Sequence, residues 1–107
     1  MSEMASLPGC AGAWRRMARC CRDAWQSGLL RGFNGHASER LPGGNVLMTR
    51  AGCAKGRLRQ RDACVLTPDG GIVLGGPASS EGRMHLVIYK ALPQTRAVLH
   101  THPPLLL

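Results

Sequence analysis

Aromatic and acidic side chains are both scarce in this chain of 107 residues. Four aromatic residues and six carboxylates stand beside 14 Lys and Arg, which gives a formal net charge of +8. Such a balance favours an anionic partner: nucleic acid, a membrane surface or a phosphorylated small molecule. Because the basic residues are scattered and few aromatic rings are available to stack on bases, the sequence gives no support to nucleic-acid binding.

Long apolar runs and paired cysteines are missing as well. No apolar run approaches the ~20 residues that span a bilayer, and no secretory signal opens the chain, so we expect no membrane partner and a cytoplasmic location. The five cysteines form no C-x-x-C pair, which favours reduced thiols over a disulfide or a Cys-rich zinc framework. With 44% hydrophobic residues, the chain is too apolar for intrinsic disorder and has the length of one small domain.

Hydrophobic periodicity predicts two amphipathic helices. The first covers residues 13–25, where apolar residues recur at steps of three and four, and Gly28 is expected to end it. The second is expected to begin at a serine cap, Ser79 or Ser80, and to end at Pro93. The apolar face of this second helix holds Met84, Val87, Ile88 and Ala91.

The remaining segments predict a small sheet. Residues 30–44 are rich in glycine and are expected to form a loop followed by a turn. Strands are predicted at 45–49, 63–67, 72–74 and 96–102, the second and third as a hairpin and the last as a buried strand. A basic loop at 54–61 connects the first two strands. The order of elements indicates an α/β or α+β fold with a mainly antiparallel sheet.

Two histidines near the end of the chain are candidate metal ligands. His100 and His102 are two residues apart on a predicted strand, so their side chains project from one face and can converge on one ion. The alternative is a pair of ordinary histidines satisfied by neighbouring groups. A catalytic zinc needs a third protein ligand, and the only other histidines are His36 and His85.

Glu81 and the Gly-rich segment at 32–38 are further candidates. A carboxylate in the first turn of a helix complements the helix dipole, and beside a metal it would also serve as a general base. The Gly-rich segment can expose backbone N–H groups to phosphate, but its spacing is neither Walker nor Rossmann. His85, one helical turn after Glu81, has a position more typical of a core histidine than of a metal ligand.

Taken in order, these segments resemble the class II aldolase and adducin family over residues 11–103. The resemblance rests on SSEGRMHLVIY (79–89), a spacer with Pro93 and AVLHTHP (97–103). It implies a layered α/β/α fold with a mainly antiparallel central sheet. It also implies a zinc-dependent aldolase-type lyase that acts on a small, phosphorylated, sugar-like carbonyl compound. Epimerases, dehydratases and decarboxylases share the scaffold.

The resemblance also implies roles for individual residues. His100 and His102 would bind Zn²⁺ or another divalent ion, and Glu81 would move the proton. The substrate's phosphate would contact Gly35, Ser38, Gly52, Ser79 and Ser80. His36 replaces the asparagine of the family's Gly-Asn-x-Ser loop, and Ala51 replaces a hydroxyl residue of its turn. The anionic end of the substrate is therefore held differently, or is not a phosphate.

The family's third histidine ligand lies beyond the segment that this chain covers. We therefore expect residues 1–107 to be the N-terminal portion of a single class II aldolase-type domain and a poor enzyme alone. By resemblance the full-length form would be a homo-oligomer, a tetramer. Two alternatives are a non-catalytic, adducin-like binding domain and an inactive truncated product. Retention of Glu81, His100 and His102 argues against a pure binding domain, which needs none of them.

Overall fold

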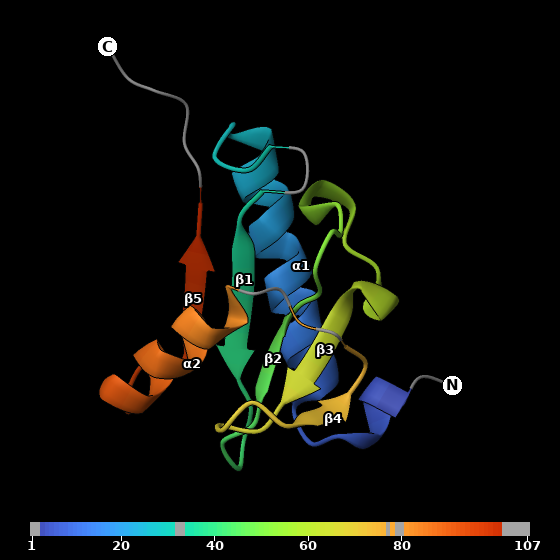
Figure 1. Cartoon of the computed structure of the whole chain (residues 1–107). Coiled ribbons are helices and arrows are strands. Elements are labelled where there is room, and N and C mark those ends of the chain that lie inside the picture. The colour runs from blue at the N-terminus through green and yellow to red at the C-terminus, as the bar shows by residue number, and fades with distance from the viewer. Residues whose placement is uncertain (1–2, 32–33, 77, 79–80, 102–107) are drawn as a thin grey trace.

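The computed structural model describes residues 3–31, 34–76, 78 and 81–101 (Figure 1). These residues form two α-helices, five strands and three short 3-10 helices. In chain order the elements are η1 (Glu3–Ser6), α1 (Cys10–Gln26), β1 (His36–Arg40), β2 (Val46–Thr49), η2 (Lys55–Arg57), η3 (Gln60–Asp62), β3 (Ala63–Leu66), β4 (Ile72–Leu74), α2 (Gly82–Ala91) and β5 (Ala97–His100).

The strands form one antiparallel sheet in the order β4-β3-β2-β1-β5. Helix α1 lies on one face of this sheet and α2 on the other, as Figure 1 shows. One apolar cluster joins α1 to the sheet through Ala37, Leu47 and Val65, and a second lies beneath α2 around Met48 and Cys64. The predicted layered fold with an antiparallel sheet is confirmed.

Helix α1 confirms the prediction from periodicity and extends it by a few residues. Its buried stripe runs along residues spaced by three and four: Cys10, Ala13, Met17, Cys21 and Ala24. Trp25 is 40% exposed and lies outside this stripe. Gly28 follows the helix with φ of 78°, the left-handed conformation that glycine adopts without a Cβ clash.

The prediction of a loop and turn for 30–44 is wrong in part, because β1 lies inside that segment. Ala37 and Glu39 face α1, where Ala37 joins the apolar cluster and Glu39 pairs with Arg16. On the opposite face, Ser38 contacts His85, and Arg40 stacks on the Tyr89 ring. Because three of these four side chains are polar, the strand shows no apolar alternation, and its sequence is typical of a loop.

Helix α2 buries a different face from the one predicted. Gly82, His85 and Tyr89 point inward, whereas Met84 and Val87 are 40% and 64% exposed. The helix begins after Glu81, its N-cap residue, whose side chain makes no capping hydrogen bond. The predicted serine caps, at 79 and 80, lie outside the described residues.

The other predicted strands are confirmed, with one correction. β3 and β4 form the expected hairpin, closed by hydrogen bonds between Thr67 and the glycines at 70 and 71. The last strand, β5, was expected to be buried but lies at the edge of the sheet, with Leu99 39% exposed. Among the described residues, no helix is both long and apolar enough to span a membrane.

Candidate functional site

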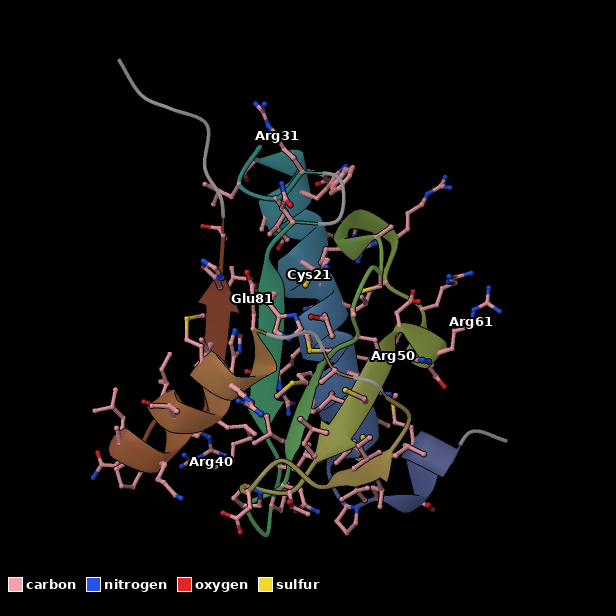
Figure 2. All side chains as sticks on the ribbon, viewed as in Figure 1. Cys21, Arg31, Arg40, Arg50, Arg61 and Glu81 are labelled. Atoms are coloured by element: carbon pink, nitrogen blue, oxygen red, sulfur yellow. The ribbon has the colours of Figure 1, made fainter. Side chains whose placement is uncertain are left out.

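Glu81 and His100 lie together although they come from different elements. Glu81 is the residue just before α2, and His100 is the last residue of β5. Oε2 of Glu81 lies 3.2 Å from Nδ1 of His100, and each side chain is about one third exposed, at 34% and 33%. The Glu81 side chain makes no capping hydrogen bond with its own helix, and its carboxylate contacts the His100 ring instead. Figure 2 labels Glu81 where α2 begins. The pair brings a base and a candidate metal ligand to a position that solvent can reach.

Two further histidines lie beneath this pair. His36 on β1 stands opposite His100 in the β1–β5 register, and His85 lies one turn after Glu81 on α2. Both side chains are fully buried, and their rings meet edge to face with centroids 4.9 Å apart. The sequence prediction of a core position for His85 is confirmed. The proximity of His36 to His85 was not predicted, because the two residues lie far apart in the chain.

Hydroxyl groups hold both buried rings. Nδ1 of His36 lies 2.6 Å from Oγ1 of Thr49, and Nδ1 of His85 lies 2.6 Å from Oγ of Ser38. The Ser38 hydroxyl also contacts the Tyr89 hydroxyl at 2.8 Å. The Nε2 atoms of both histidines are buried and have no hydrogen-bond partner among the described residues.

Burial keeps both rings uncharged. Desolvation lowers the pKa of His36 to about 4, and the neighbouring His85 and Lys55 contribute to the same shift. Desolvation also lowers the pKa of His85 to about 4, with His100 as the next cause. At neutral pH both imidazoles are therefore uncharged, and each ring offers one hydrogen-bond donor and one acceptor.

Lys55 is a site residue that the sequence analysis missed. It was assigned to the exposed basic loop at 54–61, but it is only 2% exposed and its charge acts on His36. A buried lysine is rare and usually belongs to a specific polar environment. Its position in an Arg-rich stretch gives no sequence signal that separates it from its exposed neighbours.

Of the predicted phosphate-binding residues, the three that the structure describes are not gathered at one surface. Ser38 is 3% exposed and its hydroxyl faces α2, which does not favour a direct contact with substrate. Gly35 is buried with φ of 87°, and a Cβ there would lie 2.9 Å from the backbone oxygen of His100. Gly52 is exposed with open space around it. Ser79 and Ser80 lie outside the described residues.

The two predicted metal ligands lie only partly within the described residues. Those residues contain no group of three His, Cys, Asp or Glu side chains able to hold an ion, and His102 lies outside them. The chemistry of His100 nevertheless fits a ligand. A histidine whose Nδ1–H is held by a carboxylate presents Nε2 to a metal, and such carboxylate support is the usual arrangement around zinc.

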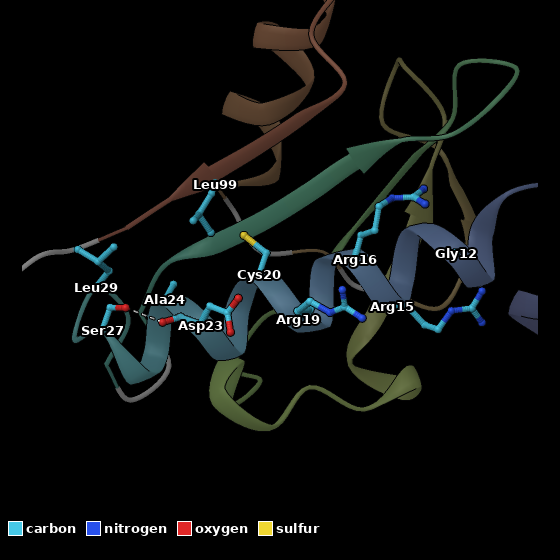
Figure 3. A pocket seen from close by; sticks show the side chains of 10 residues that line it. All are labelled: Gly12, Arg15, Arg16, Arg19, Cys20, Asp23, Ala24, Ser27, Leu29 and Leu99. Atoms are coloured by element: carbon cyan, nitrogen blue, oxygen red, sulfur yellow. Dashed lines mark hydrogen bonds between the residues drawn. The ribbon is translucent and has the colours of Figure 1, made fainter.

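A spacious groove lies elsewhere in the described part of the chain. It has a volume of about 610 Å³ and runs between α1 and β5, lined by Arg15, Arg19 and Leu99 among others (Figure 3). Leu99 and His100 are consecutive in β5 and therefore point to opposite faces of the sheet. The groove is on the α1 face, whereas Glu81 and His100 are on the α2 face.

A comparison with known protein families assigns the chain to one of them. The sequence profile of the Class II Aldolase and Adducin N-terminal domain matches residues 15–107. The chain belongs to this family. The structure and the order of the motifs agree with the match, since all of β1 to β5, α2 and most of α1 fall within it.

Two relatives show the range of activity in the family. The 3-oxo-tetronate 4-phosphate decarboxylase of Haemophilus influenzae is 34% identical over 86 residues, 80% of this chain and 41% of that protein. The 5-methylthioribulose-1-phosphate/5-deoxyribulose-1-phosphate aldolase of Escherichia coli O45:K1 is 41% identical over 83 residues, 77% of this chain and 38% of that protein. Other relatives are named methylthioribulose-1-phosphate dehydratases.

Solved structures agree with the fold. L-fuculose-1-phosphate aldolase from Thermus thermophilus superposes with a TM-score of 0.73 and is 30% identical, covering 86% of this chain and 47% of that one. The chain therefore spans less than half the length of these relatives.

Proposed function

We propose that this chain contributes the first part of the active site of a metal-dependent, aldolase-type lyase. Its substrate is a small, hydroxylated, sugar-like carbonyl compound that carries a phosphate. The observation that supports the proposal is the contact between Glu81 and His100, which joins a base to a candidate metal ligand. Relatives named as an aldolase and a decarboxylase both break carbon–carbon bonds in phosphorylated compounds, which favours a lyase of this kind.

His100 and His102 are the residues that would hold the divalent ion, most favourably Zn²⁺, which neutral imidazoles bind well. When bound, the ion supplies positive charge that stabilises the negative charge left on oxygen as the bond breaks. Glu81 keeps the His100 ring oriented and is the group placed to move a proton. A positioned acid or base of this kind contributes about 10² to 10⁴ in rate.

A decarboxylase is the second candidate, favoured by the 34% identity to the Haemophilus influenzae enzyme. Aldol cleavage and decarboxylation leave the same kind of negative charge next to a carbonyl group, so both fit the Glu81 and His100 pair. They differ in the group that leaves. A cytoplasmic homo-oligomer, tetrameric by family resemblance, remains our expectation for the full-length form.

Metal analysis tests the proposal directly. Purified chain would be dialysed against Zn²⁺ and analysed for metal together with a His100→Ala, His102→Ala double variant. We expect zinc in the wild type and its loss in the double variant, while Cys20→Ser, which removes an exposed thiol, leaves the content unchanged. Equal, substoichiometric zinc in the wild type and the double variant would contradict the assignment.

Turnover tests the reaction class. The full-length form would be assayed with phosphorylated sugars for aldol cleavage and with phosphorylated oxo acids for release of carbon dioxide. The Glu81→Gln variant keeps the shape of the side chain but cannot exchange a proton. We expect it to fold normally and to lose at least ~10²-fold in turnover. Turnover equal to that of the wild type would remove Glu81 from the mechanism.

A further inference from the structure

Glu81 and His100 are both attached to the same strand, β1. Strand β5 pairs with β1 along its whole length, and His100 stands opposite His36 in that register. Glu81 is attached to β1 through α2, which begins at the next residue. Because the two residues come from separate elements, the 3.2 Å contact between them depends on how firmly β1 holds α2.

Ser38 holds the middle of α2. Its hydroxyl lies 2.6 Å from Nδ1 of His85 and 2.8 Å from the hydroxyl of Tyr89, one helical turn further on. Ser38 is 3% exposed, and His85 and Tyr89 are buried as well. Whichever group donates each hydrogen, two consecutive turns of α2 meet at one buried atom of β1. Buried polar contacts of this kind are costly to break, so they restrict the helix to one position.

Arg40 holds the C-terminal end of the same helix. Its Nη2 donates to the carbonyl oxygen of Tyr89 and its Nη1 to that of Pro93, and its Cζ lies 4.9 Å from the centroid of the Tyr89 ring. The last carbonyl groups of a helix lack partners within the helix and carry partial negative charge, so an arginine binds them favourably. Ser38 and Arg40 are two residues apart on β1 and therefore hold α2 from one face of the strand.

Glu81 lies at the other end of α2. Its side chain makes no capping hydrogen bond with the helix, and its carboxylate contacts His100. We propose that Ser38 and Arg40 are positioning residues, which hold α2 on β1 so that the Glu81 carboxylate stays at His100. Ser38 thereby serves the reaction from the core and is not a contact for the substrate's phosphate. This inference rests on the proposed function, because a lyase that moves a proton through Glu81 needs this position to be fixed.

The two roles of Ser38 differ in their effect on the kinetics. A displacement of about 1 Å in an active site can lower the rate about 10²-fold. Loss of a residue that holds Glu81 in place should therefore lower kcat. Loss of a contact with the substrate's phosphate, made equally before and during the reaction, weakens binding and raises KM.

The contact between Glu81 and His100 can be followed by nuclear magnetic resonance in the chain of 107 residues, without metal or substrate. Nuclear Overhauser signals between the two side chains would be compared in the wild type and in Arg40→Gln, which removes the charge and the paired donors. Arg16→Gln is the matched control, since the exposed Arg16 also binds β1, through Glu39, but on the α1 face. We expect the signals to be lost in Arg40→Gln and kept in Arg16→Gln.

Turnover of the full-length form tests the effect on the reaction. Ser38→Ala should lower kcat about tenfold or more and leave KM within about threefold of the wild type. Arg40→Gln should change kcat and KM in the same way. Since Arg40 is only half-buried, this second variant keeps the proposal testable if Ser38→Ala does not fold.

Three results would overturn the proposal: signals that persist in Arg40→Gln, signals lost equally in Arg40→Gln and Arg16→Gln, or a Ser38→Ala enzyme whose KM rises while kcat is unchanged. The first two do not depend on zinc or turnover. A full-length form without lyase turnover, together with signals lost in Arg40→Gln alone, would contradict the proposed lyase and leave the attachment of α2 in place. Lyase turnover with signals unchanged in Arg40→Gln would do the reverse.

Discussion

The hydroxyl of Ser38 lies 2.6 Å from Nδ1 of His85, and this contact joins strand β1 to helix α2. Tyr89, one turn further along α2, contacts the same hydroxyl at 2.8 Å. The inner face of α2 is thus fixed to the sheet by polar groups as well as by apolar packing. Because Glu81 directly precedes α2, this attachment also determines where its carboxylate lies relative to His100.

Removal of that hydroxyl should destabilise the fold. In Ser38→Ala, Nδ1 of His85 and the hydroxyl of Tyr89 lose their shared partner in a buried place, at a cost of about 1–3 kcal/mol. Ser27→Ala is the matched control, since its hydroxyl donates to the Asp23 carbonyl on the surface and should contribute less than about 0.5 kcal/mol. Urea unfolding of the three proteins measures both values. Equal stability of the two variants would show that the buried contact contributes nothing.

Stability should fall in mild acid because of His36 and His85. Their pKa values are about 4 in the folded chain and near 6.5 in the unfolded chain, so below pH 6.5 the unfolded chain binds more protons. Their stabilising contribution is complete above pH 6.5 and is lost as the pH falls toward 4. Within that window each pH unit costs about 1.4 kcal/mol per histidine. The charged and titratable groups that act on the two rings are Lys55, Glu81 and His100.

Urea unfolding at several pH values from about 7.5 down to about 4.5 checks this dependence. His36→Gln removes one of the two titrating rings and should roughly halve the slope in the acid part of that range, where most ordinary carboxylates are still ionised. A slope unchanged by that variant would show that His36 is not the group that titrates.

Apolar periodicity was sufficient to predict α1, because its buried positions are filled by Ala, Met and Cys side chains. The β3–β4 hairpin was predicted from the turn residues at 68–71 between two short apolar runs, and β4 itself is largely exposed. β1 could not be predicted in either way. Its α2-facing residues are His36, Ser38 and Arg40, and each contacts a partner on another strand or helix. A polar residue becomes a core residue only when that partner is present, and the local sequence does not contain it.

Polar residues in the core also explain why the wrong face of α2 was predicted to be buried. Periodicity assigned the aliphatic residues Met84 and Val87 to the core, whereas His85 and Tyr89 fill it. For the site, the motifs were sufficient to bring Glu81 and His100 together. They did not indicate the His36–His85 contact or the burial of Lys55, which depend on how β1, α2 and η2 pack.

The five cysteines should differ sharply in reactivity. All are free, and Cys20 is exposed while the other four are buried. Burial raises the pKa of Cys21 to about 12 and that of Cys64 to about 11, so almost no thiolate forms there at neutral pH. Iodoacetamide at mildly alkaline pH should label Cys20 first in the native chain, as peptide mass spectrometry would show.

Unfolding in urea should then make all five thiols reactive. Cys20→Ser should abolish the rapid native labelling and leave the number of slowly reacting thiols at four. Rapid labelling of Cys21 in the native chain would contradict the burial of its side chain between α1 and the sheet.

Two glycine-to-alanine substitutions should have opposite effects on stability. A Cβ at Gly56 in η2 would lie 2.5–2.8 Å from atoms of the Trp25 ring, so the ring must move and α1 loses part of its contact with this turn. Overpacking of this kind typically costs about 1–3 kcal/mol.

At Gly12, inside α1, a Cβ would meet only the flexible guanidinium of Arg16 at 3.4 Å. Gly12→Ala should therefore stabilise the chain by about 0.5–1 kcal/mol, the helix preference of alanine over glycine. Thermal unfolding followed by circular dichroism measures both, and Trp25 fluorescence should change in Gly56→Ala only. A stabilising Gly56→Ala would show that Trp25 does not pack on η2, because only open space at that position would accept a methyl group without cost.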